Sequence, residues 1–66
     1  MKNYDRQDLI VGIKNSIAII ESRLASAEKI IESVFERRCV RNIEDATMGT
    51  LEVLFSELYA IEADLN

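Results

Sequence analysis

Histidine, proline and tryptophan are absent from this chain of 66 residues, and cysteine occurs once, at Cys39. A lone cysteine cannot form an internal disulfide, and without histidine the chain lacks a plausible zinc-binding set. The missing histidine also removes the commonest proton shuttle, and no glycine-rich phosphate loop or activated serine or cysteine is recognisable. We therefore expect no catalytic residue, no metal site and no cofactor, so the sequence predicts a non-enzymatic protein.

Glycine is also scarce, with only Gly12 and Gly49, and this scarcity is typical of helices joined by one short turn. An apolar share of 48% indicates one globular domain over residues 1–66. No uncharged apolar run approaches the roughly 20 residues that cross a bilayer. The N-terminal segment Met1–Asp8 is too acidic for a signal or transit peptide. We expect a cytoplasmic protein without membrane contact.

Basic residues are missing from the last third of the chain. Residues 1–41 carry eight basic and six acidic side chains, a charge of +2, whereas residues 42–66 carry six acidic and no basic ones, a charge of −6. The two parts can attract each other, within one chain or between two. The net charge of −4 disfavours sequence-independent binding to nucleic acid, which depends on Lys and Arg neutralising phosphates.

What the chain does have is a run of apolar residues spaced alternately three and four apart. Its members are Ile10, Ile13, Ile17, Ile20, Leu24, Ala27, Ile31 and Val34. This heptad spacing predicts one helix from about residue 5 to about residue 38, with Asp5 as its N-cap. The alternative is a three-helix arrangement in which this segment divides near Gly12 to Ser16. Asn42 is the expected N-cap of a second helix, from about residue 43 to about residue 65.

The predicted fold is therefore all-α, an antiparallel helical hairpin. The first helix would be roughly 50 Å long and the second roughly 35 Å, which leaves the apolar surface from Leu9 to Ile17 uncovered. We expect self-association to cover it, with a homodimer favoured, in a four-helix bundle or a coiled-coil-like assembly. The residues predicted to associate are Ile10, Ile13, Ile17, Ile20, Leu24, Ile31, Val34, Leu51, Leu54, Phe55, Leu58 and Ile61.

Several charged groups are candidates for partner contacts. Arg37, Arg38 and Arg41 form a basic tip that could contact an anionic partner, although cations also stabilise a helix C-terminus. The residues that could face a basic partner are Glu52, Glu57, Glu62 and Asp64. A ladder of carboxylates four residues apart, Glu28, Glu32 and Glu36, is interpreted as a solvated face.

Cys39 lies within the basic tip, and we expect it to be buried in the turn as a small apolar residue. The alternative is a redox-sensitive thiol or an intermolecular disulfide.

Taken together, the apolar spacing and the charged surfaces predict a small interaction protein that self-associates and regulates or inhibits a protein partner. The alternative function is a dimeric hairpin that binds nucleic acid through its basic tip.

Overall fold

The first helix begins where the sequence predicts. In the computed structural model, which describes residues 5–65, the Asp5 carboxylate accepts a hydrogen bond of 2.8 Å from the Asp8 amide. This bond satisfies one of the free amides of the first turn of α1, Arg6–Arg23. Met1–Tyr4, half of the segment considered above as a signal peptide, lie outside the described residues.

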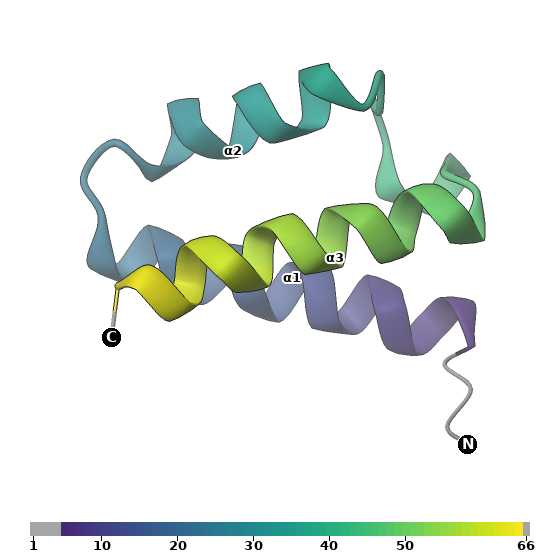
Figure 1. The fold of residues 1–66 in the computed structure, drawn as a ribbon, viewed down its shortest axis with the longest axis horizontal. Helices are drawn as coiled ribbons and strands as arrows, with labels where there is room; N and C mark the ends of the chain where they lie inside the picture. Colours follow the sequence, from purple (N-terminus) through teal and green to yellow (C-terminus); the bar gives the residue numbers. More distant parts are fainter. Residues whose placement is uncertain (1–4, 66) are drawn as a thin grey trace.

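The prediction of one helix from about 5 to about 38 is wrong, because α1 ends at Arg23 and α2 spans Ala27–Arg37. Leu24 adopts an extended conformation, with φ −124° and ψ 128°, while its amide still donates to the carbonyl of Ile20. The break therefore lies at residues 24–26, and Gly12 to Ser16, the alternative position, are helical. Breaking the helix here turns α2 back over α1, so that both halves of the apolar run face one core (Figure 1).

The second predicted helix also begins later than expected. Asn42 does cap a helix, accepting from the Glu44 amide at 3.0 Å, but this is the short 3-10 helix η1, Ile43–Asp45. The main helix α3, Met48–Asp64, is capped by Thr47, whose hydroxyl accepts from the Thr50 amide at 3.2 Å. The separate turn of η1 places Ile43 in the core.

The described residues form helices joined by short connecting segments, without a strand, which confirms the predicted all-α class. The three α-helices run up, down and up again, so that α1 and α3 are parallel and α2 is antiparallel to both (Figure 1). Between α1 and α3 the approach is close at Gly12, where a Cβ atom would lie 2.9 Å from Cε1 of Phe55. This three-helix arrangement replaces the predicted two-helix hairpin.

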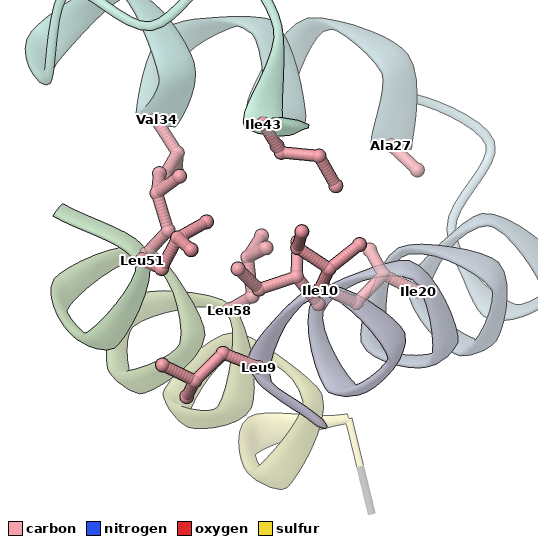
Figure 2. Packing of buried hydrophobic residues seen from close by; sticks show 10 residues of the cluster. Leu9, Ile10, Ile20, Ala27, Val34, Ile43, Leu51 and Leu58 are labelled. Carbon is pink, nitrogen blue, oxygen red and sulfur yellow. The ribbon is translucent and has the colours of Figure 1, made fainter. Parts of the chain in front are cut away.

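The core lies between the three helices, and side chains from α1, α2, η1 and α3 meet in it (Figure 2). Its buried apolar residues are Leu9, Ile10, Ile13, Ile20, Ala27, Val34, Ile43, Leu51, Leu54 and Leu58. Ser16 is the buried polar residue, and its hydroxyl donates to the Glu62 carboxylate at 3.0 Å. The surface predicted to be uncovered is therefore covered within one chain, since Leu9, Ile10 and Ile13 are buried.

Candidate protein-interaction surface

The C-terminal end of α2 is closed by a left-handed turn at Cys39, which has φ 55°. The Cys39 amide donates to the carbonyl of Glu36 and the Val40 amide donates to the carbonyl of Phe35, both at 3.0 Å. These two bonds and the left-handed residue are the features of a Schellman motif, in which the residue after the turn contacts the last turn of the helix. The turn therefore returns Val40 to the side of Phe35.

A hollow of about 310 Å³ results, which we call the α2 groove. Its apolar lining consists of Ile31, Phe35 and Val40, all of them half-buried. Its charged rim consists of Glu32, Glu36 and Arg41, all of them exposed. Apolar side chains that converge on one hollow with polar groups at the rim are typical of a binding site.

The sequence did not predict this groove, although four of its lining residues were singled out there: Ile31, Glu32, Glu36 and Arg41. Phe35 and Val40 are five residues apart, and they meet only because Cys39 adopts the left-handed conformation. Glycine is the usual residue at that position, and glycine would have been the recognisable signal in the sequence. The prediction that Cys39 is buried is wrong, because the residue is exposed. Its thiol is free.

Because a side chain in the left-handed region is strained, we expect Cys39→Gly to stabilise the fold by about 0.5–1 kcal/mol. The melting temperature, measured by circular dichroism, would then rise by roughly 2–8 °C. Cys39→Ala is the matched control, since it removes the thiol and retains the strain, and we expect it to leave the melting temperature nearly unchanged. Equal melting temperatures for the two variants would contradict a left-handed residue at this turn.

The predicted basic tip is divided between two roles. Arg38 binds Glu57 of α3 through two contacts, Nη2 to Oε2 at 3.0 Å and Nε to Oε1 at 3.3 Å. Arg37 and Arg41 remain exposed, and Arg41 lies on the groove rim. The three arginines therefore do not form one free cationic cluster.

The Arg38–Glu57 pair ties the end of α2 to α3. Its hydrogen bond lowers the pKa of the Glu57 carboxyl and raises the pKa of the Arg38 guanidinium. Because the Glu57 pKa is lower in the folded state, the pair stabilises the fold above the pKa of an unfolded carboxyl. That contribution is lost as the pH falls through the folded pKa.

The predicted acidic surface of the C-terminal helix is not one face either. Glu57 is paired with Arg38, and Glu62 accepts the hydrogen bond of Ser16. Glu52 and Asp64 are exposed, but twelve residues of helix separate them by about 120° around the axis. The four carboxylates therefore do not present a common surface to a basic partner.

The residues predicted to self-associate lie mostly in the core of the single chain. Those that are buried are Ile10, Ile13, Ile20, Val34, Leu51, Leu54 and Leu58. The half-buried ones are Ile17, Leu24, Ile31, Phe55 and Ile61. Of these, Ile31 lines the α2 groove, and Phe55 packs against Tyr59 with ring centroids 6.1 Å apart.

Within residues 5–65, no group of three or more cysteine or acidic side chains is arranged to hold a metal ion. The helices of the same residues are all too short or too polar to cross a bilayer. Comparisons with known proteins found no matching family model, no matching curated protein and no matching solved structure.

Proposed function

We propose that this chain is a small, non-enzymatic interaction protein of the cytoplasm that regulates or inhibits a protein partner through the α2 groove. The observation that carries the proposal is the convergence of half-buried Ile31, Phe35 and Val40 on one hollow of about 310 Å³. An apolar side chain of a partner that fills such a hollow removes these surfaces from water, which favours binding.

The class of the partner is inferred from the residues that are already packed or paired within the chain. The apolar run that predicted a homodimer is packed between α1, α2 and α3, so it offers no continuous surface to a second copy. Arg38 is held by Glu57, which weakens the case for the basic tip as a phosphate-binding cluster. A different protein is therefore the occupant that we propose for the groove.

A photocrosslinking experiment tests the proposal in cells of the native host. A photoreactive phenylalanine analogue replaces Arg41 on the groove rim or, as a control, the exposed Asn15 on α1. We expect a crosslink to another protein from position 41 and none from position 15. The crosslink should disappear when Ile31→Ser or Val40→Ser is added, in variants whose helical content is unchanged.

Other results would overturn the proposal. A crosslink that survives both serine substitutions would mean that the groove does not bind the captured protein. A product of twice the mass of the chain would identify a second copy as the occupant, and a crosslinked nucleic acid would support the alternative function. No crosslink from position 41 would mean that the groove has no partner in the cell.

A further inference from the structure

The strongest charge feature beside the α2 groove is the ladder of Glu28, Glu32 and Glu36. Residues four apart lie on the same side of a helix, so the three carboxylates form one strip along α2, about 12 Å long. All three are exposed, and Glu32 and Glu36 also line the groove. The ladder and the apolar lining therefore belong to one continuous surface.

Two acidic side chains outside the ladder, Glu44 and Glu57, are paired with cations in the described part of the chain. Glu57 is bound by Arg38, and the Glu44 carboxylate lies 3.5 Å from the Lys14 ammonium. In the part of the chain that the structure describes, no ion pair or hydrogen bond engages the carboxylates of the ladder. A basic partner would therefore find three carboxylates that no cation among residues 5–65 already occupies.

Building on the proposed function, we propose that the groove binds a basic amphipathic segment of the partner protein. Its apolar side chains fill the hollow between Ile31, Phe35 and Val40, while its Lys or Arg side chains meet the ladder. Apolar side chains that fill a groove provide affinity. Rim charges opposite in sign to the charges of the partner provide specificity. Arg41 fixes the orientation, because it repels a basic side chain at its end of the groove and favours an acidic or neutral one.

Two probe peptides of about 14 residues test the charge of the partner, each long enough for roughly four helical turns. One is an amphipathic helix of Leu and Lys, and the other has Glu at every Lys position. Binding to the full chain is measured by NMR titration at low and at high salt. We expect the Lys peptide to bind and to shift the amide signals of residues 31–41, and we expect the Glu peptide not to bind.

Matched variants separate recognition at the groove from attraction by the net charge. Glu32→Gln with Glu36→Gln removes two charges at the rim, and we expect the affinity for the Lys peptide to fall roughly tenfold at low salt. Glu52→Gln with Asp64→Asn removes two exposed charges on α3, and we expect the affinity to change less than twofold. Equal losses for the two pairs of variants would overturn the proposal, because net charge alone would then explain binding.

The same titrations distinguish failure of this inference from failure of the proposed function. Equal binding of the Lys and Glu peptides in the groove would refute a basic partner and leave a groove that binds apolar segments. Binding of the Lys peptide that Ile31→Ser does not weaken would instead refute the groove itself. Absence of binding by both peptides would overturn the inferred basic amphipathic partner, and the crosslink from position 41 would then decide the proposed function independently.

Discussion

The substitution Ile13→Asp is expected to unfold the whole chain. Ile13 is fully buried between the helices, so an aspartate there would place an unpaired carboxylate in the core, at a cost of several kcal/mol. A domain of this length has about 3–10 kcal/mol of stability in total. We expect far-UV circular dichroism to show loss of most helical signal at neutral pH.

Val11→Asp is the matched control, because Val11 lies on the same helix and is 46% exposed. We expect its free energy of unfolding, measured in urea, to change by less than about 0.5 kcal/mol. The result that would contradict the structure is a folded Ile13→Asp variant with weakened self-association. Ile13 would then lie in an interface between chains, as the sequence alone predicted.

The features that the sequence predicted correctly depend on neighbouring residues. The Asp5 cap needs only the Asp8 amide, three residues away, and the apolar spacing of the first helix needs only the 3.6-residue period. The same spacing cannot tell whether a buried residue meets its own chain or another copy. For this reason the spacing places Ile13 and Ile20 on a packed face, and the structure shows that both are buried by helices of the same chain.

The position of the helix break depends on tertiary structure and has no clear local signal. The helix propensities of Leu24, Ala25 and Ser26 do not predict a break. Glycine inside a helix costs roughly 1 kcal/mol relative to alanine, so propensity favours a break at Gly12 instead. In the structure the helix continues through Gly12, and the ring of Phe55 occupies the space that a side chain would take. Gly12, where propensity predicts a break, therefore allows α1 and α3 to pack closely.

The candidate site could be predicted in part for the same reason. Glu28, Glu32 and Glu36 are a local pattern on one helix, and the sequence identified them, although as a solvated face. The groove beside them forms because the turn at Cys39 brings Val40 to Phe35. A cysteine in the sequence does not predict a left-handed conformation at that position. A local strip of charge was therefore predictable, while the apolar surface next to it was not.

Proline substitution distinguishes the broken helix from a continuous one. Leu24 already has the extended conformation that the residue before a proline prefers, and within residues 5–65 the Ala25 amide donates no hydrogen bond. We therefore expect Ala25→Pro to change the free energy of unfolding by less than about 1 kcal/mol, and a small stabilisation would be consistent with a stiffer unfolded chain. The measurement is urea unfolding followed by circular dichroism.

Ala18→Pro provides the comparison, since Ala18 is exposed in the middle of α1 and loses no packing when it is replaced. There proline removes a helical hydrogen bond and clashes with the preceding turn, so we expect a loss of about 3 kcal/mol or more. If Ala25→Pro were as costly as Ala18→Pro, residue 25 would lie inside a continuous helix. The surface from Leu9 to Ile17 would then be uncovered in a single chain, and a dimer would again be needed to bury it. A large difference between the two variants requires the break that folds α2 over the core.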